Sequence, residues 1–169
     1  MKKIGPALII VFGILILVWF AVAHFYHPNS FRIGPVTYYL GNEAYKIPTK
    51  FNPINGSNKP GGTRIVIHVS YPSLKGQYED PEYAKHQLTL SKTTDTPSSP
   101  SLDEQCNDMS FCGIGDAGNV SFKKDGFTYN VHYQGGTITF AAKEELKKFE
   151  DSIIDLFNSF TQTGSNSVH

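Results

Sequence analysis

The sequence predicts an α+β protein in which an N-terminal transmembrane helix precedes a small antiparallel β-sheet domain packed by a C-terminal amphipathic helix. Three observations lead to this prediction. Residues 4–23 form an uncharged apolar run, several later segments alternate apolar and polar residues, and the last element repeats apolar residues every three or four positions. With 169 residues, the chain has room for one domain and an appendage.

Residues 4–23 are expected to form the transmembrane helix, after a cytoplasmic N-terminus of residues 1–3. At about 1.5 Å per residue, a helix of this length spans roughly the 30 Å hydrocarbon core of a bilayer. Lys2 and Lys3 precede the run, and the first basic residue after it is Arg32. The positive-inside rule therefore keeps the N-terminus in the cytoplasm and places the rest of the chain outside.

A cleaved signal peptide is the alternative to a retained anchor, because Ala21-Val22-Ala23 matches the small-residue pattern of a cleavage site. The apolar run is longer than the roughly 7 to 15 residues typical of a signal peptide. Bulky Trp19 and Phe20 also stand just before the site. The sequence therefore favours retention of the helix.

The exported domain is expected over residues 31–160, after a membrane-proximal linker of residues 24–30. A first strand is predicted within Phe31 to Leu40, around a Gly-Pro break, and a second, shorter one at Tyr45 to Ile47. The run from Asn52 to Gly62 is rich in turn-forming residues and predicts a loop.

The clearest strand is predicted at Thr63 to Tyr71, where apolar residues occupy alternate positions, and we expect it to lie in the centre of the sheet. A polar connection from Pro72 to Pro81 follows it. Gln87 to Thr93 alternates again and is predicted as a strand. Asp95 to Asp103 contains two prolines and several hydroxyl residues, so it is predicted as a loop.

Three extended runs near the end of the domain predict a meander of neighbouring strands. They are Asn119 to Phe122, Phe127 to Tyr133 and Thr137 to Phe140. The joints contain Asp125-Gly126 and Gly135-Gly136, whose glycines supply the positive φ of tight hairpins. Four apolar residues of the middle run share one face: Phe127, Tyr129, Val131 and Tyr133.

The final element changes to a helical period. Its apolar residues recur at steps of three and four: Ala142, Leu146, Phe149, Ile153, Leu156 or Phe157, and Phe160. Because the sheet offers the largest apolar surface, we expect the helix to pack on it and complete a two-layer α+β domain. The polar tail, residues 161–169, is expected to be disordered.

Cys106 and Cys112 are the two cysteines of the chain, and both lie in the segment expected outside the cytoplasm, where thiols oxidise. We therefore expect a disulfide between them, worth roughly 2 to 3 kcal/mol in the loop-entropy model. A redox pair is disfavoured because catalytic cysteines are usually separated by two residues. A zinc site is disfavoured because it needs two further ligands.

The remaining motifs favour structural interpretations, and we expect no cofactor, no metal and no catalytic residue. Gly113, Gly115 and Gly118 match G-x-G-x-x-G, but they precede a predicted strand, whereas a dinucleotide-binding loop precedes a helix. The acidic residues around Asp80 and Asp103 lack the spacing of an EF-hand. With 15 basic and 15 acidic residues, the chain has no electrostatic footprint for nucleic acid.

Phe31 to Leu40, followed by Tyr45-Lys46-Ile47-Pro48, is similar to the opening of many small bacterial envelope proteins, in which a tether leads into a strand and an Ile-Pro turn. With the C-terminal amphipathic helix, the layout resembles membrane-tethered periplasmic immunity proteins that neutralise type VI secretion effectors. The resemblance implies a single-pass protein of the bacterial inner membrane, with its domain in the periplasm and a secreted toxin as partner. It assigns no role to individual residues.

Without a catalytic constellation, and with long polar loops, the sequence favours a non-enzymatic protein that binds another protein. Two alternatives remain. One is an accessory subunit of an envelope or secretion complex, and the other is an envelope hydrolase that combines His68 or His132 with an acidic loop. Three loops are candidate partner-binding surfaces because they are polar, acidic or preorganised by the expected disulfide. Their candidate residues are Asn55, Lys59, Gln77, Tyr78, Glu79, Asp80, Glu82, Glu104, Asp108 and Phe111.

Overall fold

The computed structural model describes residues 12–19, 34–107 and 112–161. The chain divides into two compact units, Met1–Gly34 and Pro35–His169, and each is described by itself. In the first unit, residues 12–19 are helical. No helix among the described residues is both long enough and apolar enough to cross a membrane. The alternative cleavage site at Ala21-Val22-Ala23 lies outside the described residues.

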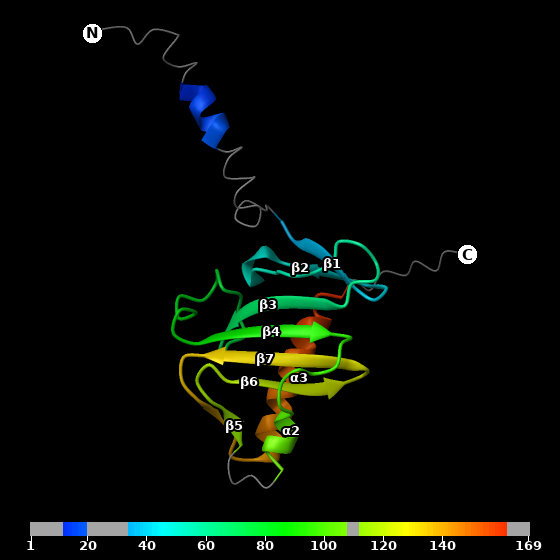
Figure 1. Cartoon of the computed structure of the whole chain (residues 1–169). Helices are drawn as coiled ribbons and strands as arrows, with labels where there is room; N and C mark the ends of the chain where they lie inside the picture. Colours follow the sequence, from blue (N-terminus) through cyan, green and yellow to red (C-terminus); the bar gives the residue numbers. More distant parts are fainter. Residues whose placement is uncertain (1–11, 20–33, 108–111, 162–169) are drawn as a thin grey trace. The chain divides into compact units, whose positions relative to one another are not determined.

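The second unit is built from three antiparallel sheets and two α-helices in the part of it that the structure describes (Figure 1). Its elements in chain order are β1 (Val36–Leu40), β2 (Glu43–Ile47), η1 (Thr49–Phe51), β3 (Arg64–Ser70), β4 (Gln87–Thr93), α2 (Leu102–Gln105), β5 (Gly113–Ile114), β6 (Asn119–Lys124), β7 (Phe127–Gln134), β8 (Ile138–Thr139) and α3 (Lys143–Asn158). The predicted α+β class with antiparallel pairing and a C-terminal helix is confirmed.

Strands β1 and β2 form a separate two-stranded sheet. Gly41 turns the chain between them with a φ of 59°, a value that glycine adopts at little cost. The segment from Asn52 to Gly62, predicted as a loop, follows η1 and has no regular structure. It is hydrogen-bonded to β1 and to β3. The Tyr39 N–H donates to the Ser57 carbonyl over 2.8 Å, and Ile54 exchanges backbone hydrogen bonds with Val66. These bonds fix the hairpin beside β3.

The four-stranded sheet has the order β3-β4-β7-β6, so the expectation that β3 lies in the centre is wrong. Its apolar residues are buried all the same, because the outer edge of β3 is covered by loops. Ile54 pairs with Val66 there, and Gly76 pairs with Val69. Because loops cover its edge, β3 is as rich in apolar residues as a central strand would be. The central strands of the sheet are β4 and β7.

The predicted meander is also wrong beyond its first hairpin. β6 and β7 pair across the Asp125-Gly126 turn, but the second neighbour of β7 is β4. β8 pairs instead with β5, a short strand that the sequence did not predict. The chain leaves the sheet at Gly135 and Gly136, whose φ values are 118° and 128°. A Cβ atom at Gly113 would collide with the Ile138 carbonyl oxygen, so the β5–β8 contact requires a glycine there.

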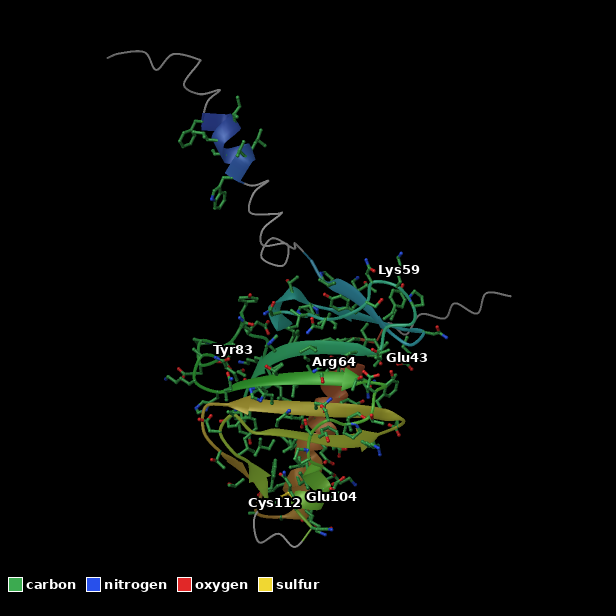
Figure 2. The ribbon with its side chains drawn as sticks, viewed as in Figure 1. Glu43, Lys59, Arg64, Tyr83, Glu104 and Cys112 are labelled. Carbon is green, nitrogen blue, oxygen red and sulfur yellow. A yellow bond between two sulfur atoms is a disulfide. The ribbon has the colours of Figure 1, made fainter. Side chains whose placement is uncertain are left out.

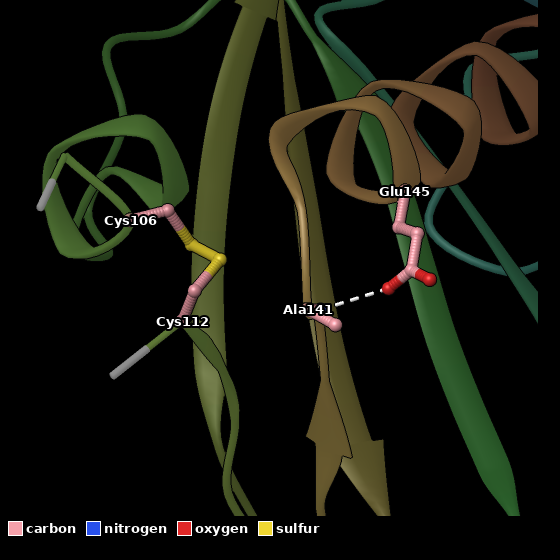
Figure 3. Close-up of a disulfide and its surroundings, with 4 residues drawn as sticks. All are labelled: Cys106, Cys112, Ala141 and Glu145. Atoms are coloured by element: carbon pink, nitrogen blue, oxygen red, sulfur yellow. Dashed lines mark hydrogen bonds between the residues drawn. A yellow bond between two sulfur atoms is a disulfide. The ribbon is translucent and has the colours of Figure 1, made fainter. Parts of the chain in front are cut away.

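The expected disulfide between Cys106 and Cys112 is present, with 4.4 Å between the two Cα atoms (Figure 3). Cys106 ends α2, a single helical turn that the sequence did not predict. Leu102 anchors this turn because its side chain is fully buried. The disulfide therefore ties α2 to the segment that enters β5.

Helix α3 covers one face of the four-stranded sheet (Figure 1), as predicted. The sequence left open whether Leu156 or Phe157 belongs to the buried face of this helix, and the structure places Phe157 there. Phe157 is fully buried and contacts Tyr129 edge to face, with 5.8 Å between the ring centroids. At the start of the helix the Ala141 N–H donates to Oε2 of Glu145 over 2.8 Å (Figure 3). The N-cap residue Ala142 has no side-chain acceptor for the first N–H groups of the helix, and the bond from Ala141 to Glu145 instead holds the residue that precedes the cap against the first turn.

Thr161, which was assigned to the expected disordered tail, is ordered in the structure. Thr161 forms a β-bridge with Tyr45, and the Lys46 N–H donates to the Phe160 carbonyl over 2.7 Å. The end of the α3 segment therefore covers the outer edge of β2. Residues 162–169 lie outside the described residues.

Candidate binding cleft

A lysine occupies an apolar position in the core of the domain. Lys92 lies near the end of β4, and only 3 % of its surface is exposed. Because side chains alternate along a strand, Lys92 shares a face with Leu88 and Leu90, which are fully buried. A buried ammonium group requires hydrogen bonds or opposite charges nearby.

One hydroxyl and three aromatic rings surround the Lys92 ammonium. Its Nζ atom donates a hydrogen bond to the Tyr45 hydroxyl over 2.8 Å. The same atom lies 4.2 Å from the ring centroid of Phe127, 5.0 Å from that of Tyr45 and 5.6 Å from that of Tyr129. All three distances are within the range of a cation–π interaction. The aromatic cage therefore replaces much of the hydration that the ammonium lost.

The hydrogen bonds continue from Lys92 through Tyr45 to the surface. The Tyr45 hydroxyl donates to Oε2 of Glu43 over 2.6 Å. Burial raises the pKa of Tyr45, the hydrogen bond to Glu43 raises it further, and burial raises the pKa of Tyr129 to about 12. Burial lowers the pKa of Lys92, whereas the charges of Glu43 and Asp125 act in the opposite direction. Both phenols are therefore protonated at neutral pH.

Part of the lining of a cleft of about 730 Å³ comes from Glu43, Lys92, Asp125, Phe127 and Tyr129, whereas Tyr45 is fully buried behind it. The β1–β2 hairpin contributes Tyr39, Asn42 and Glu43, the β6–β7 turn contributes Asp125, and the last turn of α3 contributes Asn158. Figure 2 shows Glu43 on the side of the domain where β4 ends. Parts of the chain that are far apart in sequence thus bring two carboxylates, aromatic rings and amides to one concave surface.

None of these cleft residues was among the predicted partner-binding residues. One signal could have indicated Lys92, because within Gln87–Thr93 it falls in the same alternating phase as Leu88 and Leu90. Glu43 and Asp125 carry no comparable signal. They line the same cleft only because the hairpin and the β6–β7 turn approach each other in the fold.

The first predicted surface, around Asn55 to Lys59, is exposed at both of these residues. Asn55 adopts a φ of 55°, a conformation that asparagine tolerates better than most residues. The Lys59 N–H donates to the Ser57 hydroxyl, which closes a local turn. The surface is therefore accessible and locally ordered by its own hydrogen bonds.

The second predicted surface, Gln77 to Glu82, lies against η1. Lys50 forms an ion pair of 2.9 Å with Glu79, and Asn52 donates to the Gln77 side chain over 3.1 Å. Tyr78 is exposed over 69 % of its surface, and Glu82 pairs with Lys85.

Asp80 from the same segment has a role within its own turn. Its carboxylate accepts hydrogen bonds from the hydroxyls of Ser70 and Ser73 and from the backbone N–H of Glu82. These bonds hold the pKa of Asp80 at about 2. The carboxylate therefore stabilises the connection between β3 and β4 and has little capacity left for a partner.

The third predicted surface is at the disulfide loop. Glu104 is exposed on α2, whereas Asp108 and Phe111 lie outside the described residues. Figure 2 shows Glu104 and Lys59 at opposite ends of the domain. The structure therefore does not bring the three predicted surfaces together into one site.

The histidines of the hydrolase alternative do not meet an acidic loop within the described part of the chain. Nδ1 of His68 lies 3.1 Å from the Asn52 carbonyl oxygen, a backbone group. His132 belongs to β7 and is partly exposed. In residues 12–19, 34–107 and 112–161, no group of three histidine, cysteine or acidic side chains is arranged to hold a metal ion.

Comparisons of the chain with protein-family models, with curated proteins and with solved structures gave no match in any of the three.

Proposed function

We propose that the chain is a single-pass, membrane-anchored periplasmic binding protein without enzymatic activity. In its most specific form, it is an immunity protein that neutralises a secreted toxin by occluding it. Residues 4–23 would hold the chain in the inner membrane, with residues 1–3 in the cytoplasm. We further propose that the chain binds another protein and the lipid bilayer, and that it binds neither nucleic acid nor a cofactor.

The disulfide of the exported domain is the observation that supports the proposal most. A bridge between Cys106 and Cys112 is expected to persist in an oxidising compartment and not in the cytoplasm. The uncharged run that follows Lys2 and Lys3 independently favours export of the same segment. Two unrelated features of the sequence thus support one location.

The chemistry of the cleft supports binding over catalysis. Tyr45 and Tyr129 remain protonated at neutral pH, so neither acts as a base there. The Lys92 ammonium is enclosed by three aromatic rings and donates to Tyr45. Groups held in fixed positions and protonation states suit recognition of a partner.

The location is tested with two reporters fused after Phe160. Alkaline phosphatase, which needs disulfides, should be active in the fusion, and a fluorescent protein that matures only in the cytoplasm should be dark. The opposite pattern would reject the whole proposal. Fractionation of the untagged chain distinguishes a retained anchor from a cleaved one, because only the anchored chain stays with the membranes.

The immunity function is tested by deleting the gene in cells grown beside toxin-producing siblings. The deletion should cause killing that the restored gene prevents, and unchanged survival would reject this function. Affinity purification of the full chain gives a second readout. One effector protein supports immunity, whereas a stoichiometric multiprotein machine would identify an accessory subunit instead.

A further inference from the structure

The charges that line the cleft do not balance. Glu43 and Asp125 are the two acidic lining residues, and Lys92 is the one basic residue among them. All three interact electrostatically, since the two carboxylates both act on the pKa of Lys92. One carboxylate charge is therefore left without a positive counterpart in the cleft.

The unbalanced charge lies at the accessible rim. Lys92 is only 3 % exposed, whereas Glu43 and Asp125 are both exposed. Glu43 uses Oε2 to accept from Tyr45. The structure gives the Asp125 carboxylate no hydrogen bond and no ion pair with any described residue. Both carboxylates thus retain capacity to accept hydrogen bonds from a ligand.

The remaining lining residues suit an extended organic cation. Tyr39 and Phe127 offer aromatic surface, and the side-chain carbonyls of Asn42 and Asn158 can accept hydrogen bonds. An anion would meet two exposed carboxylates, and the buried Lys92 could reach it only after losing part of its aromatic cage. A guanidinium group, with five donors in one plane, matches a pair of carboxylates best.

We propose that this cleft binds an arginine or lysine side chain of the protein partner, held between Glu43 and Asp125. The inference rests on the proposed binding function and adds to it the surface and the chemistry of the partner. The buried Lys92 and Tyr45 position Glu43 through their hydrogen bonds and do not contact the partner's cation. The sequence-derived loops at Lys59 and Glu104 are then outside the principal contact.

The test uses the full-length chain in detergent micelles and the peptide acetyl-Gly-Arg-Gly-amide as the probe. Binding is followed by the amide shifts of the isotope-labelled protein. Saturable binding with a dissociation constant below about 10 mM is expected at low salt, weakening as salt screens the charges. The peptide with citrulline in place of arginine keeps the shape but lacks the charge, and it should not bind.

Asp125→Asn is the key variant, because asparagine tolerates the φ of 51° at this turn and removes only the charge. It should weaken arginine-peptide binding by about two- to fivefold, the loss expected for one exposed charged contact. Glu43→Gln should do the same. Glu144→Gln, an equal change at an exposed residue in the first turn of α3, should leave binding unchanged and serves as the matched control.

The inference is overturned if the arginine peptide does not bind, if the citrulline peptide binds equally well, or if Glu144→Gln weakens binding as much as Asp125→Asn. It is also overturned if cells carrying Asp125→Asn capture the toxin and survive like the wild type, a result that leaves the proposed function intact. If wild-type cells gain no protection, the proposed function fails whatever the peptide does.

Discussion

At the scale of single residues, burial of Lys92 has two opposing effects on the stability of the fold. Its ammonium loses water on burial but contacts three aromatic rings and the Tyr45 hydroxyl. Its aliphatic stem packs in line with Leu88 and Leu90, where an apolar side chain would otherwise stand. The stability contributed by Lys92 should therefore come more from the stem than from the charge.

Replacing Lys92 tests this division. Lys92→Ala removes the stem and the donor to Tyr45, so the free energy of unfolding should fall by about 2 to 4 kcal/mol. Lys92→Met keeps a similar volume, and its cost should stay within about 1.5 kcal/mol. Urea denaturation of both variants measures the difference. Equal losses for the two would show that the charge, and not the stem, dominates.

Glu150 is a second residue whose environment disfavours its charge. It lies on α3 beside a cavity of about 300 Å³, and its buried Oε1 atom has no hydrogen-bond partner among the residues that the structure describes. Burial and, to a smaller extent, the carboxylates of Asp103 and Asp151 together raise the pKa of Glu150 to about 7, against the opposing charge of Lys124. The native protein therefore binds a proton at Glu150 more tightly than the unfolded chain does.

This shift predicts how stability depends on pH. Between pH 4.5 and about 7, the native state holds more of the Glu150 proton than the unfolded state, so the free energy of unfolding falls as the pH rises. Glu150→Gln should match the wild type at pH 4.5 and exceed it by roughly 1 to 2 kcal/mol at pH 8, after allowance for solvent screening. Thermal unfolding across this range measures the gap.

Glu144→Gln provides the control for that series, because Glu144 is exposed on the same helix. The gap in stability between Glu150→Gln and this control should widen as the pH rises from 4.5 to 8. A gap that does not change with pH would contradict the assignment of the pH dependence to Glu150.

At the scale of secondary-structure elements, neighbouring segments cover the outer edges of four strands. Ser57 pairs with β1, Phe160 accepts from β2, Ile54 pairs with β3, and the Pro100 carbonyl accepts from Ser121 of β6. Open strand edges invite pairing with other chains. The long loops of this chain therefore help to keep its sheets from associating edge to edge.

The disulfide acts on one element, α2 with its following loop. Changing both Cys106 and Cys112 to serine should lower the free energy of unfolding by roughly 2 to 3 kcal/mol, because the unfolded chain regains the freedom of a short loop. Denaturation with and without a reducing agent measures this. The reductant should weaken the wild type by a similar amount and leave the double variant unchanged, and sensitivity of the variant would contradict the prediction.

At the scale of the whole domain, Phe160 connects the hairpin to the helix. Its ring lies 4.9 Å from that of Phe51 and 6.5 Å from that of Phe157, while its carbonyl bonds to Lys46. The end of α3 thus joins the small sheet to the layer formed by the large sheet and the helix. The cleft lies at this junction, since its lining comes from β1–β2, the β6–β7 turn and α3.

Phe160→Ala should lower the free energy of unfolding by about 3 to 5 kcal/mol, the range for loss of a buried aromatic ring. Exposed Ser159→Ala is the matched control and should change it by less than about 0.5 kcal/mol. Thermal denaturation compares the two. A similar small effect for both would mean that the hairpin and helix are not coupled through Phe160.

Local patterns in the sequence determined the classes of element and most of their positions. Gln87–Thr93 was predicted with the bounds that the structure has, and α3 and the disulfide were also found. The strand and the helix follow from local periodicity, and the disulfide was expected from the two cysteines of the chain. The short elements α2 and β5 were missed because one turn or two residues are too short to establish a period.

Only the tertiary structure decided which strands are neighbours and where the cleft lies. Alternation reports burial but not pairing, so it could not distinguish β3 at a covered edge from a central strand, nor assign β4 as the partner of β7. Glu43, Lys92 and Asp125 are separated by long stretches of sequence. Their common site follows from long-range packing, because charge balance in a cleft depends on distances through space.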